Sequence, residues 1–290
     1  MPLPDALDAA VVAGLNNLEM HVRCTPQEAK THRAVLIEGW GDDSARIDAV
    51  AAYLVGLLAS TVSRALVVRA AITDTPADKA ELLRSVEAIA GSKSKPLSTD
   101  KKQDERNPWI AEGISHLVLV LSARRAELHP IGTIVAVDFP HVGAKDHGFD
   151  VVALYHSGGT YGMSFVESKA YANNPSGAVN DAVVFFRAFD SGDHDVRARQ
   201  TVSALRSALP LADQSAVSPS LWKDLRAYLP NPHYDSLNVV DWTTTRPSFK
   251  GLKVKREQIV VMPHSIAKFA EFFDAVGAAM LSLAEKLQDV

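Results

Sequence analysis

The chain has 290 residues, of which 47% are hydrophobic and 22% charged, which suits one large or two ordinary globular domains with ample core. The formal net charge of −4 argues against a general nucleic-acid binder, and the single cysteine, Cys24, excludes an intrachain disulfide and a cysteine-based zinc site. The N-terminus lacks a basic segment followed by an apolar stretch, and no apolar run is long enough to span a bilayer, so we expect a cytoplasmic protein without a membrane partner.

The first part of the chain reads as a small α/β region. Helical spacing of apolar residues predicts a helix over 3–22, and the apolar segment 32–40 predicts a strand. Helices are expected over 41–60 and 75–91, while the apolar run 65–72 between them is ambiguous between strand and helix end. Residues 1–98 therefore form the predicted N-terminal region, which could bind a partner protein.

The segment 91–107 has almost no large apolar residue and predicts a linker or mobile loop at a domain boundary. Beyond it, residues 105–290 form the predicted second domain. Its expected elements, in chain order, are a buried helix over 107–127, a strand over 132–139, a hairpin over 148–171, helices over 173–189 and 196–211, a short amphipathic helix over 221–229, one or two strands within 250–263, and a closing helix over 265–287. This order predicts an α/β fold, a mixed sheet with helices on its faces.

The hairpin carries the first chemical signal. If Gly158 and Gly159 form a two-residue turn, Asp150 on the first strand faces Glu167 on the second, with Cβ atoms roughly 5 Å apart. Lys169 lies two residues beyond Glu167 and therefore projects from the same face. Because facing carboxylates repel, this pattern predicts a neutralising partner.

Lys169 could supply part of that neutralisation, and a Mg²⁺ ion, with Mn²⁺ as a substitute, would supply more. A bound ion would polarise a scissile phosphate and acidify a water. Lys169 would then orient or deprotonate the water, or stabilise the transition state. The alternative is an exposed edge hairpin with a surface acid–lysine pair of little energetic value.

The three residues Asp150, Glu167 and Lys169, spaced across a hairpin and followed by a helix, resemble the PD-(D/E)xK nuclease superfamily. The segments HGFDVVAL, FVESKAY and SGAVNDAVVFFRAF are similar to the C-terminal region of HamA-type proteins, the nuclease subunit of Hachiman antiphage systems. HRAVLIEGWGDDSARIDAVAAYL is similar to the start of the same family. The likeness extends over most of the chain and is sharpest between residues 147 and 189.

The resemblance implies a restriction-endonuclease-like core and a Mg²⁺-dependent deoxyribonuclease. Asp150 and Glu167 would be metal ligands and Lys169 the catalytic lysine. The superfamily often adds a glutamate from the helix before the core sheet, which makes Glu112 a further catalytic and metal-binding candidate, although a solvated acid in the first turns of a helix is the alternative. The implied partners are DNA and a helicase of the HamB type.

Further candidates surround this core set. Asp138, His147, Asn180 and Asp181 could approach the site, but each also fits an ordinary turn or helix-start role. Residues 196–256 contain ten Lys or Arg and four Asp or Glu, a local charge of +6 that leaves −10 elsewhere. Within that basic region, the predicted DNA-binding residues are Lys250, Lys253, Lys255 and Arg256, of which Lys253 and Lys255 are expected on one strand face, unless they pair with local acids.

Two other functions remain open. One is a restriction-type nuclease subunit with sequence specificity, and the other is a non-catalytic scaffold or inhibitor whose hairpin charges form only surface pairs. The sequence has no glycine-rich phosphate loop of the Walker type, so any unwinding of DNA would have to come from a partner. The N-terminal region and the amphipathic segment 221–229 are the surfaces predicted to meet it.

Overall fold

The computed structural model describes residues 3–59, 69–70, 78–138 and 148–289. The α-helices are α1 (Leu3–His21), α2 (Ser44–Leu58), α4 (Lys79–Ala90), α5 (Thr99–Lys101), α6 (Asn107–Ser122), α7 (Pro175–Ser191), α8 (Asp195–Ala208), α9 (Leu211–Gln214), α10 (Leu221–Asp224) and α11 (Phe269–Gln288). Shorter turns are the π-helix η1 (Lys102–Arg106) and the 3₁₀ helices η2 (Ala126–Leu128), η3 (Pro247–Phe249) and η4 (Arg256–Gln258). None of these helices is long and apolar enough to cross a membrane.

The strands of the described residues form one mixed sheet of nine, in the order β1-β2-β9-β7-β6-β5-β4-β3, with β8 paired to β2. Their bounds are β1 (Arg23–Glu28), β2 (Arg33–Glu38), β3 (Arg69–Ala70), β4 (Thr133–Val137), β5 (Val151–Ser157), β6 (Thr160–Ala170), β7 (Arg226–Asp235), β8 (Val260–Val261) and β9 (His264–Ile266). The pairs β1–β2, β4–β5 and β5–β6 are antiparallel, and the central pairs β6–β7 and β7–β9 are parallel.

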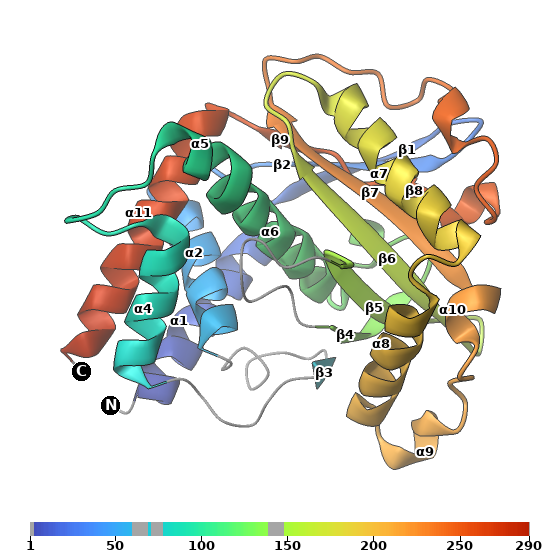
Figure 1. Ribbon diagram of the computed structural model, residues 1–290, viewed down its shortest axis with the longest axis horizontal. Helices are drawn as coiled ribbons and strands as arrows, with labels where there is room; N and C mark the ends of the chain where they lie inside the picture. The colour runs from blue at the N-terminus through green and yellow to red at the C-terminus, as the bar shows by residue number, and fades with distance from the viewer. Residues whose placement is uncertain (1–2, 60–68, 71–77, 139–147, 290) are drawn as a thin grey trace.

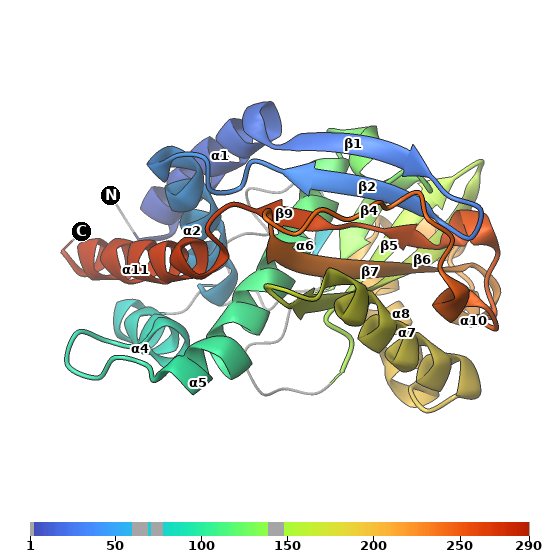
Figure 2. The ribbon, with the colours of Figure 1, turned by 90° about the horizontal axis from the view of Figure 1, so that it is seen from above.

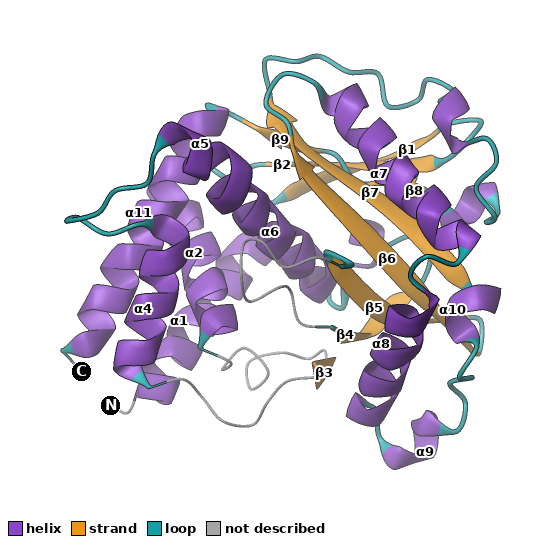
Figure 3. Ribbon diagram, viewed as in Figure 1, coloured by secondary structure: helices purple, strands orange, loops and turns teal. Residues whose placement is uncertain are grey.

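Helices cover the curled sheet, as Figures 1 and 3 show. The first apolar core lies between the sheet and α1, α2, α4, α6 and α11, and the second lies between the sheet and α7, α8 and α10. Figure 2 shows α1, α2 and α11 gathered beside one end of the sheet, with α7 and α8 along one of its faces. Residues 1–98 and 105–290, which the sequence divides into two regions, therefore share one sheet and the first apolar core.

Most predicted helices form where the residues favour them. Asp43 and Asp78 cap α2 and α4 through side-chain oxygens that accept from backbone N–H groups, and Asn174 does the same for α7. The apolar positions of α1 are buried, as the helical spacing predicted: Leu7, Val11, Leu15 and Leu18. The segment 65–72 falls outside the described residues except at β3.

Three predictions about elements were wrong. Residues 99–106 of the predicted mobile linker are helical, because Ser98 caps α5 and the buried Arg106 pairs with Asp274 at 2.6 Å. The predicted helix over 221–229 ends at Asp224 and gives way to the buried strand β7. The segment with Lys253 and Lys255 is a loop leading into η4, so these lysines share no strand face.

Strand β7 accommodates two prolines although it is central. The carbonyl of Pro230 accepts from the N–H of Met262 at 2.9 Å, so residue 230 directs its backbone groups toward β8 and β9 rather than toward β6. Pro232, two residues on, has the same orientation. On this side of β7 the hydrogen-bonded ladder is interrupted between β8 and β9, so no N–H donor is required from the two prolines. On its other side, β7 keeps a continuous pairing with β6.

A buried acid anchors α7 to β7. Asp190 accepts from Arg226 at 2.5 Å and from the hydroxyl of Tyr228, and its other oxygen accepts from the backbone N–H of Lys253 at 2.7 Å. The side chain of Asp190 is 4% exposed and that of Arg226 is 10% exposed. This network holds the helix that follows β6 against the centre of the sheet.

Replacing Asp190 with alanine is expected to destabilise the protein by about 3–5 kcal/mol, because Arg226 would remain buried without its carboxylate. The measurement is urea denaturation of Asp190→Ala beside Asp193→Ala, an exposed aspartate at the end of the same helix. A midpoint for Asp190→Ala equal to that of the Asp193→Ala control would show that the network contributes little.

Candidate active site

The β5–β6 hairpin has the register that its turn predicts. Ser157 pairs with Thr160, and the ladder continues in step to Val151 and Val166. Gly158 and Gly159 form the turn with φ of 56° and 81°, a conformation that glycine adopts without steric cost. One step past the last ladder pair, Asp150 and Glu167 stand opposite each other.

Asp150 and Glu167 are both buried, at 8% and 5% exposure. The Oδ2 atom of Asp150 accepts from the backbone N–H of Ser168 at 2.6 Å, which fixes this carboxyl group against the β6 backbone. The Nζ atom of Lys169 donates to Oε1 of Glu167 at 2.5 Å. The hairpin therefore brings the two acids and the ammonium together, as the alternation of side chains predicted.

The charges of this group act on one another strongly. Burial raises the pKa of Asp150 well above its usual value, and the negative charges of Glu167 and Glu112 raise it further. The charge of Lys169 and the Ser168 N–H oppose this rise without cancelling it. A buried carboxyl group under such repulsion is an electrostatic setting that a cation would relieve.

Lys169 responds in the opposite sense. Burial on its own would lower the pKa of the ammonium, but the charges of Glu167 and Asp150 and the hydrogen bond to Glu167 outweigh burial and raise it. Lys169 therefore keeps its proton at neutral pH. Among the roles considered for it, orienting a water and stabilising negative charge fit this state better than deprotonating a water.

Glu112 approaches from α6, on the side of the sheet opposite α7. Ser115, one turn further along α6, donates to Oγ of Ser168 at 3.3 Å, so α6 crosses β6 directly behind the site. This crossing explains why the half-buried Glu112 lies near enough for its charge to act on Asp150. Its predicted role as a ligand stays a prediction.

Gly148 and Phe149 directly precede Asp150 in the chain and pack against other elements. The Phe149 ring packs on Phe165 and Phe189, with centroids 5.0 and 5.4 Å away. A Cβ at Gly148 would lie 1.9 Å from the guanidinium carbon of Arg197 on α8, so a larger residue there would displace the end of the Arg197 side chain. The aromatic contacts of Phe149 constrain the backbone immediately before the carboxylate.

The other candidate residues predicted near Asp150, Glu167 and Lys169 lie in different places in the structure. Asp181 accepts from the Tyr171 hydroxyl at 2.7 Å and so lies beside the segment that follows Lys169. The backbone N–H of Asp138 donates to Val152, which extends the β4–β5 ladder toward the site. His147 lies outside the described residues.

Two of the predicted DNA-binding cations are engaged within the protein. Lys253 donates to the Asp190 carbonyl at 2.8 Å, and Arg256 donates to the Ala29 carbonyl at 2.8 Å and pairs with Glu28. Lys250 and Lys255 are exposed. The basic character of this region therefore serves partly to fasten the loop after η3 to α7 and to the β1–β2 turn.

A buried polar layer behind Glu167 was missed by sequence analysis. His233 on β7 lies with Nδ1 3.4 Å from Oγ of Ser168, and its ring stacks on that of His264 at a centroid distance of 4.1 Å. Burial lowers the pKa of His233 to about 3, so the pair is neutral. The signal that could have revealed this layer was the strand β7, whose first residues were predicted as part of the helix over 221–229 and whose remainder, with His233, was assigned to no element.

The donor set suits a magnesium-type cation. Two buried carboxylates face each other, and Mg²⁺ in proteins often takes one or two carboxylates and retains several waters. Across the described residues, no three His, Cys, Asp or Glu side chains are gathered closely enough to form a ready-made metal site. Asp150 and Glu167 could therefore supply two oxygen ligands to such an ion, and waters would complete its coordination.

No protein-family model matches the sequence, and none of the curated proteins is significantly similar to it. The fold and the site define an α/β protein with a buried acid–acid–lysine cluster at the end of a β-hairpin. The family resemblance stays a prediction from the residues that carry it.

Proposed function

We propose that this chain is a divalent-metal-dependent nuclease that hydrolyses DNA phosphodiester bonds. The observation that carries the proposal is the pairing of Asp150 and Glu167, two buried carboxylates on opposing strands, with the Lys169 ammonium 2.5 Å from Glu167. A purely structural hairpin gains nothing from burying like charges, whereas a metal-dependent phosphodiesterase uses carboxylates of this kind to hold its ion.

We assign each residue of the cluster a role within this proposal. Asp150 and Glu167 would hold Mg²⁺, or Mn²⁺ in its place, and Glu112 is the proposed further ligand. When bound, the ion would polarise the scissile phosphate and lower the pKa of a water. Lys169, protonated and held by Glu167, would orient the attacking water and stabilise the charge that develops on the phosphoryl oxygens. The Ser168 N–H keeps Asp150 in place throughout.

The mixed sheet supports a finer assignment within the same proposal. A β5–β6 hairpin that carries the acids, with α6 behind it and α7 after it, matches what a restriction-endonuclease-like core would require. The biological setting implied by the resemblance is antiphage defence, in which a HamB-like helicase restrains the nuclease and releases it to cut DNA. This setting rests on analogy alone.

The test is degradation of supercoiled and linear DNA by the purified chain, alone and with the helicase partner, in Mg²⁺, Mn²⁺ or EDTA. We expect cleavage that requires the metal and shows little sequence preference. Discrete fragments from defined sites would favour a restriction-type subunit. Absence of cleavage under every condition, with the partner present, would favour a scaffold and contradict the nuclease proposal.

A further inference from the structure

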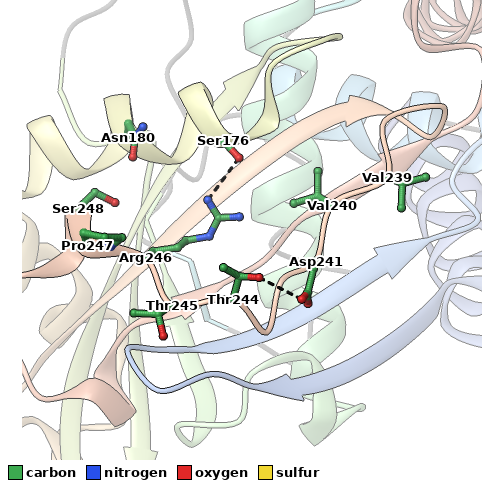
Figure 4. Close-up of a pocket in the computed structure, with 10 residues that line it drawn as sticks. All are labelled: Ser176, Asn180, Val239, Val240, Asp241, Thr244, Thr245, Arg246, Pro247 and Ser248. Carbon is green, nitrogen blue, oxygen red and sulfur yellow. Dashed lines mark hydrogen bonds between the residues drawn. The ribbon is translucent and has the colours of Figure 1, made fainter.

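A hollow of about 590 Å³ lies between the first turns of α7 and the segment after β7. Figure 4 shows Ser176 and Asn180 of α7 on one side and residues 239–248 on the other. Hydroxyl groups from both sides line it, those of Ser176, Thr244, Thr245 and Ser248 among them. Arg246 reaches across the hollow toward Ser176.

The positive charge of Arg246 is poorly compensated by nearby acidic side chains. Its Nη1 atom is 3.5 Å from Oγ of Ser176, and its buried Nε has no hydrogen-bond partner among the described residues. Asp241 is the acid whose charge reaches it, but Asp241 accepts hydrogen bonds from Thr243 and Thr244 instead. A half-buried guanidinium whose terminal nitrogens make only the long contact with Ser176 among the described residues is suited to an anionic ligand.

The guanidinium is also held in a fixed orientation. It stacks on the Trp242 ring at 4.6 Å, and the Arg246 backbone N–H donates to the hydroxyl of Thr31 at 3.1 Å. The Trp242 carbonyl is 3.1 Å from Nε2 of the fully buried His32. These contacts fasten the loop to the β1–β2 turn, so little side-chain freedom would be lost when Arg246 binds a ligand.

The hollow and the candidate active site flank the same end of α7. Strand β6 ends one residue after Lys169, and α7 begins five residues later. Asp181 on α7 accepts from Tyr171 on the side of the active site, while its neighbour Asn180 lines the hollow. Ser176, which also lines the hollow, lies in the first turn of this 17-residue helix, where the helix dipole adds a positive potential.

We propose that this hollow binds a backbone phosphate of the DNA substrate, with Arg246 as the principal contact and the hydroxyls of Ser176, Thr245 and Ser248 as further donors. The planar guanidinium can donate two parallel hydrogen bonds to phosphate oxygens, which a lysine cannot. This inference rests on the proposed nuclease function and assigns a second contact for the strand, next to the bond that is cut.

The test is fluorescence anisotropy of labelled single-stranded and duplex DNA, titrated over a range of salt concentrations without divalent metal. Arg246→Gln is expected to weaken binding about 10- to 100-fold through loss of charge-assisted hydrogen bonds. The slope of log K against log salt should also fall by about 0.9 for duplex or 0.7 for single strands. Arg84→Gln, which removes an exposed arginine on α4, should change neither quantity.

Asn180→Asp is a second variant that separates binding from folding. Residue 180 is exposed on α7, so this exchange should cost little stability, yet it places a negative charge at the lining of the hollow, so DNA binding should weaken while the melting temperature holds. This variant decides the matter if Arg246→Gln does not fold.

Each outcome has a distinct meaning. Wild-type affinity and salt slope in both variants, with the wild type cleaving DNA, would overturn this inference and leave the nuclease proposal intact. A wild type that neither binds nor cleaves DNA would overturn both. In that case, inorganic phosphate that stabilises the wild type but not Arg246→Gln would assign the hollow to a small phosphate ligand instead of DNA.

Discussion

Replacing Glu167 with glutamine is expected to reduce Mg²⁺-dependent DNA cleavage by a factor on the order of 10³ or more. Glutamine keeps the shape of the side chain but removes the negative charge that would hold the metal and that fixes the Lys169 ammonium at 2.5 Å. A metal that stabilises the transition state by several kcal/mol corresponds to this factor, since about 1.4 kcal/mol is tenfold in rate. This single exchange would therefore remove both the charge that binds the metal and the charge that holds Lys169.

The measurement is the initial rate of plasmid cleavage, with DNA affinity measured in parallel. The matched control is Glu257→Gln, which makes the same exchange at an exposed residue in η4. We expect Glu167→Gln to bind DNA at least as well as the wild type, because removing a carboxylate lessens repulsion of phosphates. Cleavage by Glu167→Gln at the rate of the Glu257→Gln control would contradict the assigned site.

The hairpin could be predicted from the sequence because its geometry is local. Two consecutive glycines between apolar runs determine the turn, and the turn determines every pair up to Val151 and Val166. The alternation of side chains then places Glu167 and Lys169 on one face. Asp150 is further constrained by Ser168, whose N–H bond to the carboxyl group no pattern of residue types could reveal.

Strand β7 could not be predicted because its structure depends on distant segments. The run LWKDLRAYLP has helical spacing, and prolines at 230 and 232 argue against a central strand. The structure resolves the conflict through β6 on one side and the interrupted β8–β9 edge on the other. Because this strand was not predicted, the buried polar layer around His233, which lies behind the site, was not predicted either.

Arg246 was missed for a related reason. The segment around it is rich in threonine and proline and reads as an ordinary loop. Its importance comes from Trp242, which stacks on the guanidinium, and from Thr31, more than 200 residues away, which holds the backbone. By contrast, Lys253 and Arg256 lie in a basic segment that predicted a phosphate-binding strand. In the structure their side chains contact Asp190, Glu28 and Ala29 of the protein itself.

Replacing Asp150 with asparagine is expected to abolish cleavage and at the same time to stabilise the protein by roughly 1–3 kcal/mol, since a buried charge is costly. Asparagine retains an oxygen that can accept from the Ser168 N–H, so the hydrogen bond at 2.6 Å survives. It removes the repulsion from Glu167 and Glu112 that raises the pKa of Asp150. The melting temperature should therefore rise by several degrees, roughly 2–4 °C per kcal/mol, while Asp193→Asn, at an exposed position, should leave it unchanged.

The stabilisation should depend on pH and on metal in a defined direction. Because the pKa of Asp150 is raised in the folded protein, its burial carries no ionisation cost below the unfolded value of about 3.9, and the cost grows as pH rises through the folded pKa. The difference in melting temperature between Asp150→Asn and the wild type should thus be small in acid and largest at neutral and higher pH. Mg²⁺ or Mn²⁺ should raise the melting temperature of the wild type by mass action but not that of Asp150→Asn. If Asp150→Asn and the wild type have equal melting temperatures at every pH, the buried Asp150 carboxylate does not destabilise the folded protein. If both respond equally to the metal, Asp150 is not a metal ligand.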